Sequence, residues 1–516
     1  MTHAIDNRSY WNATAPAVRF PALSGELSVD VAIVGGGIVG VTTARLLKDR
    51  GLTVALVEAR RIGEEVTGKS TAKITSQHNV TYTTIRRKFG EEGARLYAEA
   101  NEAGLAAIRN LAAGHRIDCD LESADAIAFT QDEQQVSAIE DEAKLAAELG
   151  LPATLTRETG LPFDVLAAMR WTDQARFHPV KYLKALAATL PGGGCHVFED
   201  SRVIDWDPDR IATSGGTVRA RHVVMATHLP LGQIGLFYTE AHPHMDPVLM
   251  GRVDPARAPQ GMYINVEQPR RSFRLHRDAE GQSWMIFAGT AHKPGETETQ
   301  REKQAEIERF AAETFGVRPE YRWTNEDYGP IDQAPFVGWS SSLRPGYLVA
   351  TGFNAWGITN GTAAAMLIAD LATGRDNPWL KLFDATRIKP IAGAAEFVKG
   401  NAEVAGHLIG GYLKRKPHEF ETLEAGEGRV LKIDGHNVAA YRDDQGEVHA
   451  VSAVCTHMGC LVGWNGTDRT WDCPCHGSRF EPDGTVLHGP AVTPLARADG
   501  EEGSGAARGV EEVAGA

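Results

Sequence analysis

The hydrophobic pattern near the N-terminus predicts a β-α-β unit. A short apolar run over 29–34 is followed by a glycine-rich turn and then by a helical pattern over 38–50. Gly51 ends that helix, and residues 53–58 have the apolar character of a second strand. Because a crossover helix joins strands that run in the same direction, the pattern predicts a parallel sheet.

The rest of the chain shows helical patterns first and sheet patterns later. Ala-rich amphipathic stretches over 91–111 and 133–149 predict helices. Residues 261–290 alternate apolar and polar side chains, which predicts a sheet with one solvated face. Further strands and one helix are predicted at 197–203, 222–226, 346–352 and 358–371. From His418 onward, short strands with Gly and Asp turns predict a small all-β unit.

These patterns divide the chain into five segments. We expect an α/β module built on a doubly wound parallel sheet, with an interleaved α+β region, followed by the small all-β domain. The segments are an N-terminal arm (1–28), the α/β module (29–391), a linker (392–417), the all-β domain (418–498) and a disordered tail (499–516). The tail is rich in Gly and Glu and has almost no large apolar residue, which favours disorder.

Composition and charge narrow the classes of partner. The formal net charge is −14, which argues against nucleic acid as a partner because phosphate binding relies on an excess of Lys and Arg. No apolar run approaches the ~18 residues that a membrane-spanning helix needs. The first residues also lack the basic and apolar regions of a secretory signal. We therefore expect a cytoplasmic protein without a membrane span.

Four of the six cysteines lie close together near the C-terminus, beside two histidines. Cys455 and His457 form one pair, and Cys473 and His476 form a second. Two thiolates suit one iron of a 2Fe–2S cluster, and two neutral imidazoles suit the other. A zinc ribbon is the alternative, although zinc ribbons more often pair two CxxC motifs.

The motif resembles that of the Rieske proteins of the cytochrome bc complexes, over residues 419–496. The cluster ligands that this resemblance implies are Cys455, His457, Cys473 and His476. It also implies a disulfide between Cys460 and Cys475, and a hydrogen bond from Ser478 to a cluster sulfide. Phe480 stands where the high-potential proteins have tyrosine, so we expect a reduction potential below the top of the Rieske range.

The glycine-rich turn carries a dinucleotide-binding motif of the Rossmann type. Gly35 permits a tight turn, Gly37 lets a pyrophosphate approach the backbone, and Gly40 lets the helix pack on the strand. Amides at the helix N-terminus then face the anion. Glu58 ends the next strand, where a carboxylate can accept both ribose hydroxyls. The motif does not distinguish NAD from FAD, and a glycine-rich turn without a ligand is the alternative.

Two further segments, 67–75 and 352–361, resemble the D-amino-acid oxidase type of flavoprotein, which includes glycine and sarcosine oxidases. In that family the first segment lies along the flavin, and the second presents a helix N-terminus that stabilises negative charge on the reduced ring. The resemblance covers residues 30–388 and implies FAD as the cofactor. The FAD-binding residues that it adds are Thr67, Ser70, Thr71, Ala72, Val203, Gly352, Asn354, Gly357, Ile358 and Thr359.

Some residues of this module have two possible roles. His228 follows Ala-Thr where the family usually has glycine, so it either crowds the cofactor or starts a different loop. Arg274 is the candidate clamp for a substrate carboxylate, with a surface arginine as the alternative. Lys69 and Lys73 either contact the flavin or are solvated turn residues. We predict no catalytic base among His78, His178 and His292, because hydride transfer to a flavin mainly needs a positioned substrate.

Together the motifs predict an FAD-dependent oxidoreductase that oxidises a C–N or C–OH bond of a small, amine- or amino-acid-like substrate. Segments 288–295 and 327–332 resemble a group that fuses such a module to a Rieske domain. Electrons would leave through the cluster to an external acceptor, either a small molecule or a protein, at an exposed edge formed by His457 and His476. The alternatives are an electron-transfer reductase and a redox sensor switched by Cys460 and Cys475. A Rieske oxygenase is excluded because too few residues follow His476 to form a separate mononuclear iron domain.

Overall fold

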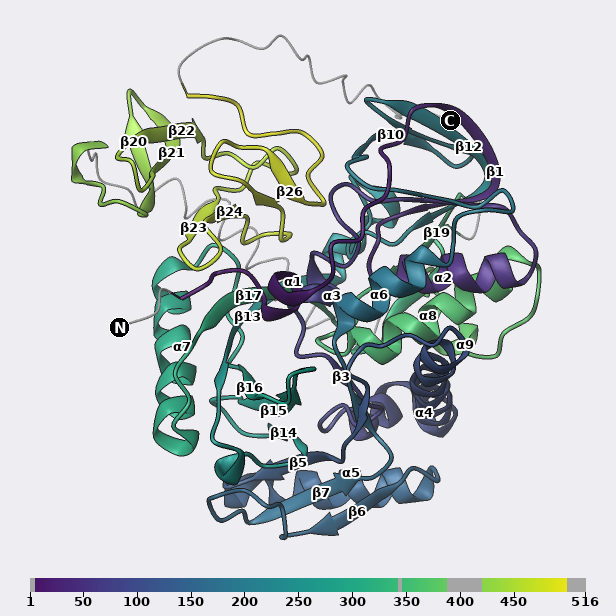
Figure 1. Cartoon of the computed structure of the whole chain (residues 1–516), viewed down its shortest axis with the longest axis vertical. Coiled ribbons are helices and arrows are strands. Elements are labelled where there is room, and N and C mark those ends of the chain that lie inside the picture. Colours follow the sequence, from purple (N-terminus) through teal and green to yellow (C-terminus); the bar gives the residue numbers. More distant parts are fainter. Residues whose placement is uncertain (1–4, 342–345, 388–419, 499–516) are drawn as a thin grey trace, which may run out of the picture.

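The computed structural model describes residues 5–341, 346–387 and 420–498. The predicted linker (392–417) and tail (499–516) lie outside the described residues. Figure 1 shows a parallel sheet around β1, β12 and β19, an antiparallel sheet that runs from β17 to β6, and a small all-β domain above β13 and β17.

The parallel sheet contains the predicted β-α-β unit. β1 (Gly25–Val34) pairs in parallel with both β2 (Val54–Val57) and β12 (Gly216–Met225), and α2 (Ile38–Asp49) crosses between β1 and β2. β1 begins four residues before the predicted strand. The order is β10-β11-β12-β1-β2-β9, with β19 on β12 and β18 on β19. The other strands are β9 (His196–Phe198), β10 (Val203–Asp207), β11 (Arg210–Thr213), β18 (Phe336–Trp339) and β19 (Tyr347–Thr351).

Helices cover this sheet and connect it to the rest of the module. α8 (Gly357–Ala372) packs beside α2, and the long α4 (Tyr82–Gly114) packs on α8. All three β1 positions from Ala32 to Val34 and all of β2 are buried, as expected for strands covered on both faces. The shorter elements are α3 (Val66–Lys69), α6 (Pro179–Ala188), α9 (Leu380–Phe383), β3 (Lys73–Ile74), β4 (Glu122–Ser123) and β8 (Ala175–Arg176).

The N-terminal arm packs against the segment predicted to bind FAD. It contains α1 (Tyr10–Thr14), whose Trp11 is fully buried. The Trp11 indole donates a hydrogen bond to the Ser70 carbonyl over 2.9 Å. The arm therefore supports segment 67–75 from behind.

The antiparallel sheet follows the order β17-β13-β16-β15-β14-β5-β7-β6. Its strands are β5 (Ala126–Thr130), β6 (Ala153–Thr156), β7 (Ala167–Trp171), β13 (Ala241–Arg252), β14 (Met262–Asn265), β15 (Ser272–Arg277), β16 (Ser283–Ala288) and β17 (Tyr321–Pro330). The expected solvated face over 261–290 is wrong, because both faces of these strands are covered. Met262 and Ile286 join the core shared with the parallel sheet, whereas Tyr263 and Phe287 pack into a second core against α7 (Thr297–Phe310). α5 (Val136–Glu148) packs on β6 and β7.

The C-terminal domain consists of short strands, as the sequence predicts. One sheet has the order β20-β21-β22 and the other β23-β24-β25-β26. The strands are β20 (Gly428–Ile433), β21 (His436–Arg442), β22 (Val448–Ser452), β23 (Gly463–Asn465), β24 (Thr470–Asp472), β25 (Arg479–Phe480) and β26 (Val486–His488). Trp464, Trp471 and Phe480 form its core together with the four clustered cysteines.

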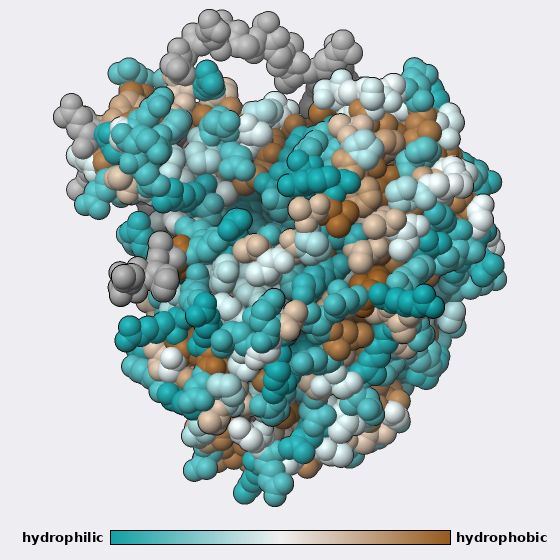
Figure 2. All heavy atoms as spheres, viewed as in Figure 1, coloured by the Kyte–Doolittle hydropathy of each residue, from teal (hydrophilic) through white to brown (hydrophobic). Residues whose placement is uncertain are grey.

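The small domain is docked closely on the large one. A Cβ on Gly463 would lie 2.0 Å from the Gly295 carbonyl oxygen, so the two backbones touch at this point. Thr297, at the start of α7, donates a hydrogen bond to the Trp464 carbonyl over 2.7 Å. No helix within the described ranges is long and apolar enough to cross a membrane. The face in Figure 2 is largely hydrophilic, with hydrophobic residues in small separate groups.

Candidate functional site

A cavity of about 700 Å³ lies where the predicted FAD-binding segments meet. Its volume is typical of a ligand site. The predicted residues that line it are Gly35, Gly37, Glu58, Thr67, Ser70, Thr71, Ala72, Val203, Asn354, Gly357, Ile358 and Thr359. Gly40 and Gly352 were also predicted to bind FAD, but they lie behind this lining.

The glycine-rich turn has the geometry that a pyrophosphate site requires. Gly35 has a φ of +106°, and a Cβ there would lie 2.4 Å from the Ala226 carbonyl oxygen. A Cβ on Gly40 would lie 1.9 Å from the Gly35 carbonyl oxygen, which confirms the predicted packing role of Gly40. By contrast, a Cβ on Gly37 would meet only the Thr67 hydroxyl, at 3.4 Å. The backbone at Gly37 is thus open to the cavity, at the N-terminus of α2.

Glu58 lies at the end of β2 with its carboxylate held in place. One oxygen accepts a hydrogen bond from the Gly36 amide over 2.7 Å, and the other from the Arg60 amide over 2.8 Å. Burial raises the pKa of Glu58 above its ordinary value, although both amides oppose that shift. Each oxygen retains a lone pair, so the residue fits its predicted role toward ribose.

α8 points its N-terminus toward the cavity. The turn before it contains Asn354 and Ala355, which have φ values of +51° and +67°. Trp356 precedes the helix without a side-chain cap. A helix end without such a cap leaves amide donors for a ligand, which fits the negative edge of a reduced flavin.

Arg274 does not face the cavity, and its predicted role as a substrate clamp is wrong. It is fully buried, and its guanidinium donates hydrogen bonds to the carbonyls of Thr71 and Phe177 over 2.6 and 3.2 Å. A third bond goes to its neighbour Leu275 over 3.0 Å. The side chain therefore fixes segment 67–75, and Arg274 is absent from the lining of the cavity. The surface alternative is wrong as well.

Neither lysine of segment 67–75 is a solvated turn residue. Lys73 donates hydrogen bonds to the Tyr263 carbonyl and the Ser272 hydroxyl over 2.8 and 2.7 Å, and burial lowers its pKa to about 7. Lys69 is ion-paired across the domain boundary. Its Nζ lies 3.4 Å from an Asp468 carboxylate oxygen of the small domain.

Two of the histidines that were weighed as bases are held by structural contacts. His78 is fully buried, hydrogen-bonded to the Tyr97 hydroxyl over 2.7 Å, and its pKa is lowered by burial to about 3. His178 caps α6 by accepting a hydrogen bond from the Lys181 amide. These contacts favour the prediction that neither residue is a catalytic base.

The four predicted cluster ligands lie together on two loops, between β22 and β23 and between β24 and β25. The rings of His457 and His476 are 5.0 Å apart, and Cys455 and Cys473 are buried free thiols. Both histidine Nδ1 atoms are buried and have no hydrogen-bond partner among the described residues. Two free thiols beside two unpartnered imidazole nitrogens fit a Rieske-type 2Fe–2S cluster.

The residues around the ligands also fit the Rieske resemblance. Cys460 and Cys475 are joined by a disulfide in the structure. Contact with Cys473 and, to a smaller extent, a hydrogen bond with Ser478 lower the pKa of Cys455 to about 7. Ser478 thus lies where its hydroxyl can reach sulfur.

The histidine edge of the cluster site faces the large domain, so the expected exposed edge is wrong at His476, whereas His457 is half-buried. His476 is only 4% exposed. Tyr238, in the 3-10 helix η2 (Ile234–Thr239), packs on His457 and His476 with ring distances of 5.1 and 4.8 Å. The Tyr328 hydroxyl donates a hydrogen bond to the His476 carbonyl over 2.9 Å. The small domain therefore docks by the end that carries the ligands.

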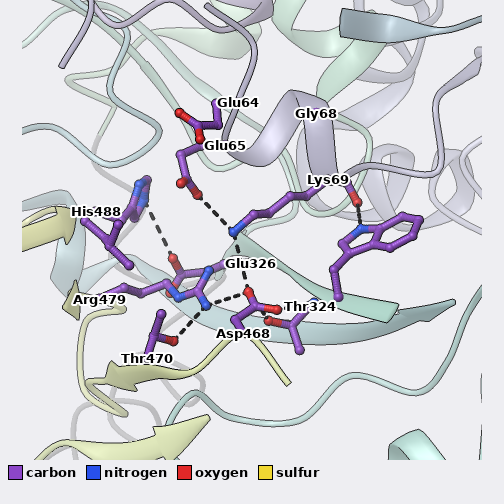
Figure 3. A network of polar contacts seen from close by, with 12 residues as sticks. Glu64, Glu65, Gly68, Lys69, Thr324, Glu326, Asp468, Thr470, Arg479 and His488 are labelled. Atoms are coloured by element: carbon purple, nitrogen blue, oxygen red, sulfur yellow. Dashed lines mark hydrogen bonds and ion pairs between the residues drawn. The ribbon is translucent and has the colours of Figure 1, made fainter. Parts of the chain in front are cut away.

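A buried charge network joins the two domains beside this contact (Figure 3). Asp468 accepts hydrogen bonds from the amide and hydroxyl of Thr324 on β17, both over 2.9 Å. It also pairs with Arg479 over 2.7 Å, and Arg479 pairs with Asp472 over 3.0 Å. Lys69 completes the network by contacting Glu65 over 3.2 Å. Ion pairs this deeply buried hold only while every partner is present.

The cavity also has a wall that the sequence did not predict. The small domain contributes Leu487, His488, Gly489, Ala491 and Val492 to its lining. The large domain adds polar residues from β13 and β17, among them His244, Asp246 and Asp327. Behind them Glu326 is buried, and burial raises its pKa well above the ordinary value. The sequence signals for this region are the unusual His228 and the segments 288–295 and 327–332, the second of which contains Asp327.

Comparison with known proteins identifies both parts of the chain. The family of FAD dependent oxidoreductases matches residues 30–371, and the Rieske [2Fe-2S] domain matches residues 416–499. The protein YhfW of Bacillus subtilis, described as a Rieske 2Fe-2S iron-sulfur protein, is 35% identical over 497 residues, or 95% of this chain and 97% of YhfW. Gamma-glutamylputrescine oxidoreductase of Escherichia coli is 23% identical over 394 residues, covering 71% of this chain and 89% of its own length. Glycine oxidase from Geobacillus kaustophilus has a similar fold, with a TM-score of 0.58 and 19% identity over 70% of this chain and all of that one.

Proposed function

Because the chain belongs to the FAD-dependent oxidoreductases and carries a C-terminal Rieske 2Fe–2S domain, we propose that it oxidises a small substrate and passes the electrons through the cluster to an external acceptor. One observation carries this proposal. The cavity that fits FAD is lined by both domains, and the cluster ligands face the large domain rather than solvent. Such an arrangement shortens the path between the two redox groups.

The proposed FAD site uses the residues that line the cavity. Gly37 and the start of α2 would bind the pyrophosphate, Glu58 the ribose, and the start of α8 the flavin ring. Val203 would contact the adenine through its backbone. Bound FAD supplies the hydride-accepting chemistry, and the chain binds and orients the substrate against it.

The proposed substrate has a C–N or C–OH bond and resembles an amine or amino acid. Gamma-glutamylputrescine oxidoreductase and glycine oxidase, which are similar to this chain, both carry names of nitrogen-containing substrates. Arg274 does not line the cavity, whereas seven other cationic residues do: Arg61, Lys69, Lys73, Arg87, Lys88, Arg202 and Arg270. Arg270 lies next to the β14–β15 turn and is the candidate partner of a substrate carboxylate.

The proposed electron path crosses the domain contact. Reduced FAD holds two electrons, whereas one 2Fe–2S cluster accepts a single electron at a time, so the flavin would release its electrons in two one-electron steps. Tyr238 and Tyr328 belong to the large domain and contact the cluster ligand His476. Met458, which is 46% exposed beside His457, marks the solvent side of the ligand loop, where an external acceptor would approach.

The alternative of a redox sensor is disfavoured by burial. The two cysteines of the disulfide, Cys460 and Cys475, are each only 1% exposed. A switch that responds to cellular thiols needs an accessible sulfur. The electron-transfer reductase remains the alternative function, and the next experiment distinguishes it from substrate oxidation.

Anaerobic reduction of the full-length protein tests the proposal. We expect flavin absorbance to bleach with a member of a panel of amino acids, N-methyl amino acids, amines and hydroxy acids. The electron paramagnetic resonance signal of the reduced cluster should follow. Faster bleaching by NADH than by any panel member would favour the reductase. Bleaching without a cluster signal would remove the cluster from the path.

A further inference from the structure

Three ligand-type side chains converge at the domain boundary, away from the cluster ligands. They are His228 after β12, Glu326 on β17 and His488 at the end of β26, and one donor atom from each lies within 4.8 Å of the others. His228 Nδ1 is 3.3 Å from His488 Nε2, and His488 Nε2 is 3.6 Å from a Glu326 carboxylate oxygen. Figure 3 shows His488 and Glu326 pointing toward one another from the two domains.

Glu326 lacks the partners that a buried carboxylate needs. The residue is 2% exposed, and neither carboxylate oxygen has a hydrogen-bond partner among the described residues. The nearby Arg479 is already paired with Asp468 and Asp472. Buried polar groups are normally satisfied, so this carboxylate requires a partner that the protein chain does not supply.

His228 is oriented as metal-bound histidines are. Its Nε2 lies 3.0 Å from an Asp327 carboxylate oxygen, which directs Nδ1 toward His488. A carboxylate on the far nitrogen is the usual arrangement for a histidine that ligates a metal. His228 also has a φ of +68°, in the left-handed region that favours glycine. A histidine in that conformation persists where its side chain is needed.

We propose that His228 Nδ1, His488 Nε2 and a Glu326 carboxylate oxygen bind one divalent transition-metal ion, separate from the 2Fe–2S cluster. Two imidazoles and one carboxylate are a donor set for Zn²⁺ or Fe²⁺. An ion bound at about 2.1 Å sets its donors roughly 3.0–3.4 Å apart. His488 Nε2 lies 3.3 Å from His228 Nδ1 and 3.6 Å from the Glu326 oxygen, and all three donors lie within 4.8 Å of one another. Docking assembles these donors from both domains.

The ion would have two roles that follow from its place. Two ligands come from the large domain and one from the small domain, so the ion ties the domains together. His228 and His488 both line the FAD cavity, so the remaining coordination positions open toward it. The site is thus able to contact a ligand in the cavity as well as to hold the domains.

Element analysis of the full-length, tag-free protein tests the proposal. Acid-labile sulfide counts the cluster, and mass spectrometry counts iron and zinc. We expect one transition-metal ion per chain beyond the iron that matches the sulfide. If the ion is lost in purification, incubation with Zn²⁺ or with Fe²⁺, followed by gel filtration, should restore it. Comparing the two incubations identifies the metal.

Three variants locate the ion. Glu326→Gln and His488→Gln should each remove it while the sulfide content stays at the wild-type value. His228→Gly should do the same, and glycine suits the left-handed backbone if the other variants fold poorly. The control is His449→Gln, which changes a second His–carboxylate group, formed with Asp443 and Glu447 within the small domain; the extra ion should be retained in this variant. The proposal is overturned if the wild type binds no extra ion after metal incubation, or if an extra ion survives in all three variants. In either case the three side chains lie side by side without binding an ion.

Discussion

The cluster site and the FAD cavity are built in different ways. The four cluster ligands lie on two loops of one small domain and are backed by that domain's own core of Trp464, Trp471 and Phe480. The FAD cavity instead draws its walls from both sheets, from two helix N-termini and from segment 487–492 of the other domain. The cluster site is therefore self-contained, whereas the cavity is complete only when the small domain is docked.

The largest effect is expected from disrupting the contact between the two domains at Asp468. Asp468→Ala removes the acceptor of the Thr324 amide and leaves Lys69 and Arg479 without their shared partner. Breaking a buried ion pair on one side typically costs about 3–5 kcal/mol. We expect weaker docking and faster FAD loss during dialysis, with iron and sulfide contents unchanged.

The control for that variant is Asp444→Ala. Asp444 pairs with Arg469 on the exposed side of the same domain, where an ion pair contributes at most about 1 kcal/mol. FAD retention should stay at the wild-type value in this control. If Asp468→Ala lost the cluster and retained FAD, the cluster site rather than the FAD cavity would be the one that depends on docking.

Lys73, which lines the cavity, makes the stability of the large domain depend on pH. Its folded-state pKa of about 7 lies below the ordinary value of 10.5. Between these values the unfolded chain binds more protons, so the free energy of unfolding rises with pH. Relative to Lys73→Met the slope is about 1.4 kcal/mol per pH unit across that window. Urea unfolding of the FAD-free protein at several pH values measures this slope. Lys381→Met, at an exposed lysine, serves as the control.

The Glu58 prediction tests the adenosine side of the cavity. Glu58→Ala removes charge-assisted hydrogen bonds to the ribose and should weaken FAD binding by about 1.5–3 kcal/mol. Glu58→Gln retains one acceptor oxygen, so its affinity for FAD should lie between those of the wild type and Glu58→Ala. Fluorescence titration of apoprotein with FAD measures both. Equal affinities in all three proteins would show that Glu58 does not bind the ribose.

The same difference between the sites explains what the sequence could predict. The cluster ligands are local in sequence, so the resemblance to the Rieske motif is enough to predict Cys455, His457, Cys473 and His476 as one site. The β-α-β unit, the Gly40 packing contact and the all-β domain follow from equally local patterns. Arg274 was misassigned because its partners Thr71 and Phe177 are distant in sequence. The buried edge at His476 and the meeting of His228 with His488 depend on docking, which no local pattern encodes.

The smallest effect is expected at the hydrogen bond that joins the two sites. Tyr328→Phe removes the hydroxyl that donates to the His476 carbonyl. Burial raises the Tyr328 pKa well above its ordinary value, so the hydroxyl stays a donor at any working pH. A hydrogen bond of this kind contributes about 0.5–1.5 kcal/mol, or a several-fold change in an equilibrium. Stopped-flow measurement of cluster reduction after flavin reduction should therefore show a several-fold slower second phase, with the first phase unchanged. Tyr238→Leu is the matched variant, since it removes the ring that packs on both histidines while Tyr328 keeps its bond. If neither variant alters the second phase, electrons reach the cluster by a route that avoids this contact.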